Sequence, residues 1–395
     1  MSRIISIGTA VPKYETQQST ILEFMLAAYN DETASRKLKL LFNHSGISTR
    51  YSVIPDFDES NPNHFLFNGN QYIPNVNDRS KIFLEHAVPL AIEAIEDSLN
   101  KLNITIADAE ITHLITVSCT GLMAPGIDAT IMEQLDLPRD IFHTSMNFLG
   151  CNAAFPALKL ADMIVKTEIN ARVLIVCVEL CTIHFQAKNN NDNLLSNTIF
   201  GDGAAAVIVT SDSDTKFNYA NGLAINGFYS LLLDKGKDLM GWNITPVNFE
   251  MILDAKVPEF IGNEVDNILF NAGRKLKITT ASIDKWAIHP GGKKILDSIK
   301  KQLQLNDSDL QYSYKVLDQY GNMSSPTILF VLNEIMESPH KKNETIFSIG
   351  FGPGLSIETA LFTFVPKSIL ESKESFENSK DLNPVQSKEW YTNLF

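Results

Sequence analysis

The run of residues 172–180 limits what this chain can fold into more than any other stretch. Apart from Arg172 and Glu179 its residues are apolar, and they lack the polar alternation of a half-exposed strand. We therefore interpret the run as a strand buried on both faces of a sheet. A sheet covered on both faces needs helices on each side, which predicts an α/β fold.

Strands and helices alternate along the rest of the chain. We expect strands at 3–7, 113–118, 142–146, 204–210, 285–288, 345–349 and 356–364, and helices at 18–42, 80–101, 127–135, 248–276, 293–303 and 325–336. The order restarts after Ser211, so we infer two similar halves, residues 1–215 and 216–366. Residues 367–395 are polar with little periodicity, which predicts a loosely held C-terminal extension.

The charge balance excludes two classes of partner. The 395 residues carry a formal net charge of −13, whereas nucleic-acid and anionic-membrane binders need a basic surface. The four cysteines form no CxxC pair and no ligand spacing with histidine, so we expect neither a disulfide scaffold nor a metal site. No signal segment and no apolar run of about 20 residues is evident. We expect a cytoplasmic protein without a membrane span.

Cys151 is the first candidate for chemistry. It stands between a loop carrying Gly150 and a segment with helical spacing of small apolar residues. A thiol at a helix N-terminus is favoured as the reactive thiolate. The alternative is a small buried hydrophobic residue. Pro156 falls in the opening of this helix, where we expect it to kink or restart the helix and to weaken the dipole effect.

Two further residues can assist a cysteine nucleophile. His289 ends an expected strand and precedes Pro290, Gly291 and Gly292 in a turn, which is where α/β sheets place ligand chemistry. Asn322 lies in a turn that opens the helix at 325–336. Taken singly, each has a plain alternative, a histidine satisfied by backbone and a helix-capping asparagine.

The motifs in their order resemble the type III polyketide synthases, the chalcone-synthase-like branch of the thiolase superfamily, over roughly residues 3–364. The segments that carry the resemblance are Gly150-Cys151, Phe200-Gly201-Asp202-Gly203-Ala204-Ala205-Ala206, Ile288-His289-Pro290-Gly291-Gly292, Tyr320-Gly321-Asn322-Met323-Ser324-Ser325 and Gly350-Phe351-Gly352-Pro353-Gly354-Leu355. The resemblance implies a five-layered αβαβα thiolase fold and a homodimer. It also implies that Cys151, His289 and Asn322 form a catalytic triad and that Phe200 is the gatekeeper between a CoA tunnel and the reaction cavity.

The implied reaction uses CoA thioesters and no other cofactor. Cys151 would take an acyl group from acyl-CoA, with His289 as the ion-pair partner that lowers the thiol pKa. Malonyl-CoA would then lose CO2 while His289 and Asn322 hydrogen-bond the thioester oxygen. Lys293 and Lys294, at a helix start, can meet CoA phosphates or can be solvated residues. Arg36, Lys37 and Lys39 are weaker candidates, and His44 stands near an arginine of plant relatives.

Several positions depart from plant members of that family. Cys119 and His184 each replace a threonine, Ala124 replaces a methionine that reaches the partner subunit, and Glu259 replaces a cavity glycine. The resemblance implies a hydrogen-bonded network of Glu179, residue 119 and Ser324 that biases product release. Because a thiol is a weaker donor than a hydroxyl, that bias does not transfer to Cys119.

The leading hypothesis is a synthase that extends a CoA starter iteratively with malonyl-CoA and releases a cyclised aromatic or pyrone. A β-ketoacyl-acyl-carrier-protein synthase III-like enzyme, which makes one condensation, is the first alternative. A catalytically silent thiolase-fold protein that binds acyl-CoA is the second.

Overall fold

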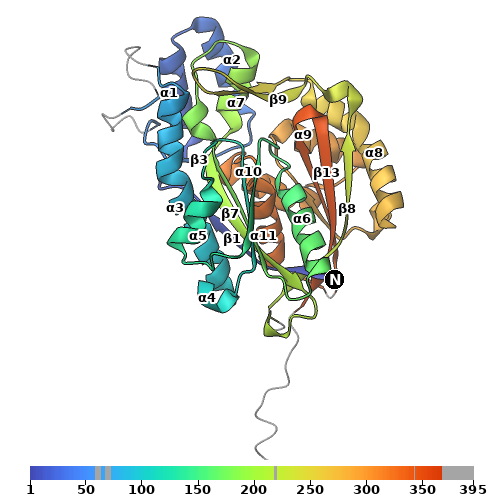
Figure 1. Ribbon diagram of the computed structural model, residues 1–395. Helices are drawn as coiled ribbons and strands as arrows, with labels where there is room; N and C mark the ends of the chain where they lie inside the picture. Colours follow the sequence, from blue (N-terminus) through green and yellow to red (C-terminus); the bar gives the residue numbers. More distant parts are fainter. Residues whose placement is uncertain (58–63, 67–72, 218–219, 342, 367–395) are drawn as a thin grey trace, which may run out of the picture.

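The centre of the computed structural model, which describes residues 1–57, 64–66, 73–217, 220–341 and 343–366, is one nine-stranded sheet (Figure 1). The strand order is β11-β12-β13-β8-β1-β7-β6-β4-β5. These strands are β1 Ser2–Ala10, β4 His113–Ser118, β5 Phe142–Asn147, β6 Val173–Leu180, β7 Asp202–Ser211, β8 Gly222–Leu232, β11 Lys285–Ile288, β12 Thr345–Gly352 and β13 Ser356–Val365. The extension expected at 367–395 lies outside the described residues.

The strand arrangement repeats between the two halves of the chain. In the first half, β1 pairs antiparallel with β7, β7 antiparallel with β6, and β6 parallel with β4. In the second, β8 pairs antiparallel with β13, β13 antiparallel with β12, and β12 parallel with β11. A short antiparallel pairing of β1 with β8, at Arg3–Ala224 and Ile4–Leu223, joins the halves into one sheet. The expected α/β fold with two similar halves is confirmed.

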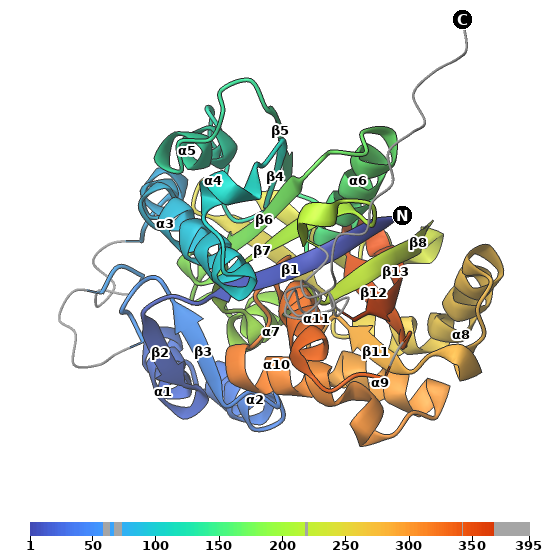
Figure 2. The ribbon, with the colours of Figure 1, turned by 90° about the horizontal axis from the view of Figure 1, so that it is seen from below.

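Helices separate and cover the two sets of strands, which gives five layers (Figure 2). Helix α3 (Val76–Leu102) packs on β1, β6 and β7, whereas α8 (Val257–Leu276) packs on β8 and on α9 (Lys293–Leu303) at the opposite side. Between them, α6 (Ala154–Thr167) and α11 (Thr327–Glu337) contact strands of both halves. Three clusters of buried apolar side chains fill the space between the layers: one includes α3, one includes α6 and α11 with strands of both halves, and one includes α8 and α9.

Strand β6 shows why the sequence required this layering. Leu174, Val176 and Val178 belong to the apolar core that contains α3, whereas Val173 and Ile175 belong to the core that contains α6 and α11. Because side chains alternate across a strand, an uninterrupted apolar run buries both of its faces. The expectation of a doubly covered strand is confirmed.

The other elements lie around this framework. The remaining strands pair as β2 (Tyr14–Gln17) with β3 (Thr49–Ser52) and β9 (Met240–Ile244) with β10 (Phe249–Leu253). The remaining α-helices are α1 Gln18–Tyr29, α2 Glu32–Asn43, α4 Ile106–Ala109, α5 Ile127–Gln134, α7 Asn191–Ile199 and α10 Gln311–Tyr320.

Two sequence expectations about elements are wrong, and strand β8 was missed. The helix expected at 18–42 is two helices, because Asn30 is left-handed (φ 43°) and the Asp31 side chain caps α2 by accepting from the Ala34 N–H at 2.7 Å. The helix expected at 248–276 begins only at Val257, after strand β10. Strand β8 was not expected, because the second half of this strand is partly exposed and its pattern is weak.

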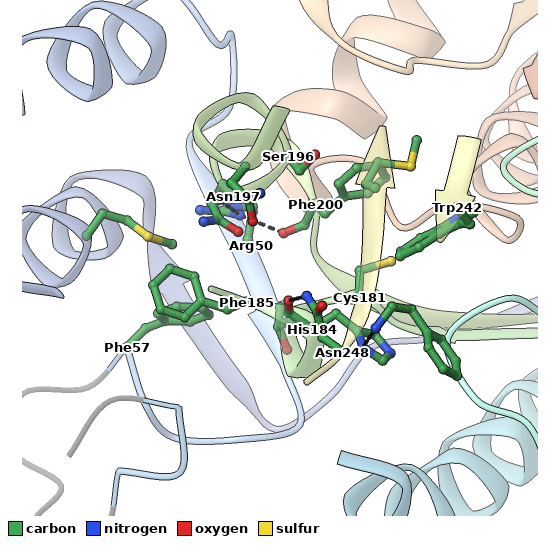
Figure 3. A pocket seen from close by; sticks show the side chains of 15 residues that line it. Arg50, Phe57, Cys181, His184, Phe185, Ser196, Asn197, Phe200, Trp242 and Asn248 are labelled. Carbon is green, nitrogen blue, oxygen red and sulfur yellow. Dashed lines mark hydrogen bonds between the residues drawn. The ribbon is translucent and has the colours of Figure 1, made fainter. Parts of the chain in front are cut away.

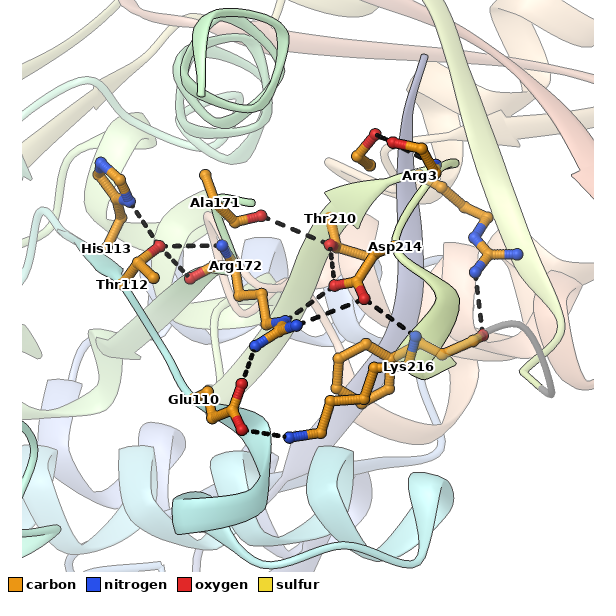
Figure 4. Close-up of polar contacts among 12 residues, drawn as sticks. Arg3, Glu110, Thr112, His113, Ala171, Arg172, Thr210, Asp214 and Lys216 are labelled. Atoms are coloured by element: carbon orange, nitrogen blue, oxygen red, sulfur yellow. Dashed lines mark hydrogen bonds and ion pairs between the residues drawn. The ribbon is translucent and has the colours of Figure 1, made fainter. Parts of the chain in front are cut away.

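A polar network joins chain segments at one end of the strands of the first half (Figure 4). Arg172 Nε donates to Asp214 Oδ2 at 2.8 Å, and its guanidinium also pairs with Glu110. Lys216 Nζ lies 2.8 Å from the second Glu110 oxygen. These bonds link the start of β6 to the segments after α4 and β7.

Candidate active site

Cys151 lies in a turn that leads into α6, with only 5% of its surface exposed. The backbone before it is unusual, because Gly150 has φ +84° and a Cβ there would lie 2.2 Å from the Cδ of Pro353. The turn between β12 and β13 therefore packs directly on the cysteine loop, and only glycine fits at position 150. Asn152 anchors the same contact by donating to Ser356 Oγ at 2.9 Å.

Pro156 fits helix α6 without a kink. The helix begins at Ala154, so Pro156 is its third residue. The N–H groups of the first turn have no partner within a helix, and a proline there sacrifices no hydrogen bond. The expected kink at Pro156 is therefore absent, whereas a helix start does fall there, at Ala154, and α6 runs on to Thr167.

Asn322 is fixed by its backbone and by its side chain. Its N–H donates to the Ile199 carbonyl at 2.9 Å, and its own carbonyl accepts from the Gly201 N–H at 3.0 Å. The Oδ1 atom accepts from the Ser324 N–H at 2.8 Å, and Nδ2 donates more weakly to the Gly291 carbonyl at 3.4 Å. The amide thus connects the turn after α10 with the Gly-Gly turn that follows His289.

His289 directly follows β11 and is 1% exposed. Its backbone N–H donates to the Ile349 carbonyl at 2.9 Å, which ties it to β12. Within the described residues, neither ring nitrogen has a hydrogen-bond partner. The imidazole is therefore not the backbone-satisfied histidine of the plain alternative, and both nitrogens remain available to a reacting group.

Burial of Cys151 and His289 governs the ionisation of their side chains. Burial raises the pKa of the Cys151 thiol to about 11, although interactions with the Ser324 and Asn322 side chains oppose that rise. Burial lowers the pKa of His289 to about 3. Desolvation of the charged sulfur therefore opposes the thiolate that the helix N-terminus is expected to favour, and the help of a partner such as His289 stays a prediction.

Glu179 is the centre of a buried polar cluster beside the cysteine. It is fully buried, and it accepts from the Cys119 N–H at 2.9 Å, from the Thr120 hydroxyl at 2.8 Å and from the Cys119 thiol at 3.1 Å. Glu179 also accepts from the hydroxyl of Ser325, in the turn after Asn322, at 2.7 Å. Ser324 lies 3.9 Å from the Cys119 sulfur and has no direct bond to the carboxyl group. Burial raises the pKa of Glu179, although the hydrogen bonds from Ser325, Cys119 and Thr120 oppose that rise.

Phe200 lines a small cavity of about 40 Å³ (Figure 3). Cys181, His184 and Trp242 line it too. The His184 ring stacks on Phe249 with centroids 4.7 Å apart and contacts the Thr120 carbonyl at 2.7 Å. Burial lowers the pKa of His184 to about 3, so it is neutral.

Glu259 lines neither this cavity nor the cavity of about 460 Å³ described below. It is exposed in the first turn of α8, so its expected place in the reaction cavity is wrong. Trp242 of β9 takes a position in the wall instead, and nothing in its local sequence indicated this.

A larger cavity of about 460 Å³ lies between α2, α7, α8 and the start of α9. Its wall is mostly apolar, with four basic side chains, Lys37, His44, Lys293 and Lys294, and one acidic side chain, Asp254. Lys39 is exposed and does not line it. Gly291 and Gly292 form part of the same wall, so the cavity reaches the turn that carries His289.

Other kinds of site have little support within the part of the chain that the structure describes. No group of three or more His, Cys, Asp or Glu side chains is arranged to hold a metal ion. None of the helices in the described ranges is both long and apolar enough to cross a membrane.

Fold and site together define a class of protein. Two similar α/β halves with two helices buried between them are the thiolase arrangement.

The chain belongs to the chalcone and stilbene synthase family: profiles of the N-terminal and C-terminal domains of chalcone and stilbene synthases match residues 1–213 and 230–366. The resemblance inferred from the motifs is therefore confirmed, and the chain is an acyltransferase of the type III polyketide synthase class.

Relatives and solved structures agree with this assignment. The alpha-pyrone synthesis polyketide synthase-like Pks18 of Mycobacterium tuberculosis is 28% identical over 367 residues, which cover 92% of this chain and 91% of that protein. The PKS-I of the brown alga Ectocarpus siliculosus superimposes with a TM-score of 0.83 at 26% identity, covering 92% of this chain and 98% of the other. The C-terminal type III polyketide synthase domain of Steely1, from Dictyostelium, gives a TM-score of 0.81 at 26% identity, covering 92% and 99%.

Proposed function

We propose that Cys151 is the acyl-carrying nucleophile of this synthase, with His289 and Asn322 as its catalytic partners. The observation that supports this most is the position of the Asn322 amide. It interacts with the Cys151 thiol and donates to the carbonyl of Gly291, two residues beyond His289. Three distant segments therefore meet at one buried point.

In the loading step, the Cys151 sulfur attacks the thioester carbon of an acyl-CoA. The thiol proton passes to His289, the bond from carbon to the CoA sulfur breaks, and the CoA thiolate takes the proton back as it leaves. The ion pair forms only together with proton transfer, because burial disfavours either charge alone.

In the extension step, malonyl-CoA loses CO2, and the electron pair of the broken bond becomes an enolate. Donors from Asn322 and His289 would stabilise the developing oxygen charge, a contribution that typically amounts to about 10²–10³ in rate. The enolate carbon attacks the Cys151 thioester, which forms a carbon–carbon bond and releases the thiolate. Decarboxylation supplies the carbon nucleophile, so no strong base is required.

The cavity of about 460 Å³ is the proposed entrance for both CoA thioesters. Its apolar wall suits the pantetheine arm, and Lys37, Lys293 and Lys294 bring positive charge to its rim on an acidic protein. His44 belongs to this wall, whereas Lys39 is a poorer candidate because it lies outside it.

The proposed product is a cyclised aromatic or pyrone. The name of the mycobacterial relative refers to alpha-pyrone synthesis, which favours a pyrone. Phe200 is the proposed gatekeeper. The cluster of Cys119, Glu179 and Ser325 is placed to influence release, with Ser324 beside it.

We further propose a cytoplasmic homodimer that needs no resident cofactor. Strand β5 is one of the two edge strands of the sheet, the other being β11, and much of β5 is exposed. The exposed apolar side chains of Leu122, Phe142 and Leu149 lie along or next to that edge, as a dimer interface requires. Residues 1–215 and 216–366 are the proposed halves, with the boundary between β7 and β8.

The test is turnover with malonyl-CoA and a panel of acyl-CoA starters, measured as CoA and CO2 release. We expect release well above that of Cys151→Ala and products longer than one extension. A single extension would favour a synthase III-like enzyme, and no release above the Cys151→Ala background would contradict the proposal.

A further inference from the structure

A buried arginine outside the expected catalytic set lies behind the gatekeeper. Arg50, in β3, is 2% exposed. Its Nη1 donates to the backbone carbonyl oxygens of Phe200 at 2.6 Å and Asn197 at 2.9 Å (Figure 3). Its Nε donates to Gln18 Oε1 at 2.9 Å. The guanidinium therefore hydrogen-bonds to the backbone on both sides of the α7 C-terminus.

The end of α7 depends on such donors. The last carbonyl groups of a helix have no partner within the helix. Arg50 satisfies the Asn197 carbonyl, and the next two carbonyls accept from Gln18 Nε2 at 2.8 Å and from the Asn322 N–H at 2.9 Å. A cation is also favourable at a helix C-terminus. The direction in which the chain leaves α7, and hence the position of Phe200, follows from these bonds.

The same arginine contacts the segment that carries Asn322. Phe200 and Asn322 form a parallel backbone bridge. Beside it, Gly321 has φ +68°, and a Cβ at that position would lie 3.0 Å from the Arg50 Cδ and Cγ atoms. The aliphatic part of Arg50 thus packs against the backbone next to Asn322, while its guanidinium holds Phe200.

The charge of this side chain is retained at neutral pH. Burial lowers the pKa of Arg50 to about 9, and the negative charge of Asp202 opposes that fall. Lysine cannot reproduce the contact, because a single ammonium lacks the planar set of donors that reaches several carbonyl oxygens at once.

We propose that Arg50 is a positioning residue for decarboxylation and condensation, which fixes Phe200 and Asn322 relative to each other. This inference rests on the proposed role of Asn322. Arg50 acts through these two residues, and the entrance cavity that binds CoA does not include it. A displacement of about 1 Å at reacting groups can cost about 10² in rate, so its loss should lower kcat and leave KM nearly unchanged.

The test measures decarboxylation of malonyl-CoA to acetyl-CoA by wild type, Arg50→Lys and Arg50→Met, with melting temperatures. We expect kcat to fall about 10²-fold in Arg50→Met and about tenfold in Arg50→Lys, with KM within threefold of wild type. Arg3→Met and Arg3→Lys are the matched controls, because Arg3 is 5% exposed and donates to the Phe217 carbonyl at 3.0 Å, outside the site. The controls should lose stability and keep kcat within threefold.

Folded Arg50 variants with kcat within threefold of wild type would overturn the positioning role, and so would an equal loss of kcat in the Arg3 variants. If Arg50→Met fails to fold, the comparison of Arg50→Lys with Arg3→Lys decides. If Arg50→Lys also fails to fold, Gln18→Leu removes the acceptor of the Arg50 Nε atom, and its kcat is compared with wild type by the same threefold limit. A wild type that forms no acetyl-CoA would overturn the proposed function itself, which is a different result from an active wild type with active Arg50 variants.

Discussion

Replacement of His289 by glutamine tests whether ionisation of Cys151 depends on this imidazole. Burial raises the pKa of the thiol to about 11 and lowers that of the imidazole to about 3, so neither group is charged alone near neutral pH. Transfer of the proton from sulfur to imidazole creates two charges that offset each other, so the pair titrates as a unit. Glutamine fills a similar space and cannot accept that proton.

The magnitude follows from the thiol pKa. With a pKa of about 11, about one thiol in 10³ is ionised at pH 8, and the fraction rises about tenfold with each pH unit. Alkylation of Cys151 by iodoacetamide in His289→Gln should therefore rise about tenfold per unit between pH 7 and 9. We expect the wild type to react faster at pH 7, with a much flatter pH dependence, because the pair titrates as a unit.

The assay is peptide mass spectrometry of alkylated protein at several times and pH values. Cys177 and Cys181, both buried, serve as internal controls in the same digest. If wild type and His289→Gln show the same rate and the same pH dependence, His289 does not control the thiol and the proposed ion pair is refuted.

Three further predictions follow from the site and its surroundings. Lys293→Ala, which removes positive charge from the entrance cavity, should raise KM for malonyl-CoA about three- to tenfold at low ionic strength with little change in kcat. Lys39→Ala, outside that cavity, should leave KM unchanged. Equal effects of the two variants would contradict the proposed entrance. Burial lowers the pKa of His184 to about 3. The neutral ring therefore stabilises the fold fully above its ordinary pKa of 6.5, and this contribution is lost as the pH falls toward 3, by up to about 1.4 kcal/mol per pH unit. Between pH 7 and 5, the free energy of urea unfolding should fall less for His184→Gln than for wild type, and an identical fall would exclude this contribution. Pro156→Ala should change the melting temperature by less than about 3 °C, because no hydrogen bond of α6 is missing at that position, and a large rise in calorimetry would show that the proline strains the helix.

Local patterns predicted most of the framework. The apolar run of β6 and the helical spacing of α3, α6 and α9 can be recognised without tertiary information, because each element buries its own apolar positions. The single helix expected at 18–42 was wrong although Asn30 and Asp31 carry ordinary helix-end and helix-start signals. Strand β8 escaped recognition because its pairing with β13 defines it more than its own pattern does.

The candidate site was only partly predictable. Cys151, His289 and Asn322 were proposed from their motifs, and their roles remain a prediction that the spatial arrangement makes testable. Arg50 could not be recognised, because its importance depends on where α7 and the segment of Asn322 meet in space. Glu259 was misplaced for the same reason, since the position along the chain did not predict which segment forms the cavity wall. The burial that raises the pKa of Cys151 could not be read from a helix start, because it depends on the segments packed around the thiol.

The most direct measurement for the central claim is intact-mass and peptide analysis after brief exposure of wild type and Cys151→Ala to an acyl-CoA without malonyl-CoA. We predict one acyl group on wild type, located on Cys151 as a thioester that hydroxylamine removes, and none on Cys151→Ala. A lack of acylation in wild type, or an acyl group on another residue that persists in Cys151→Ala, would contradict the assignment of Cys151 as the nucleophile of this synthase.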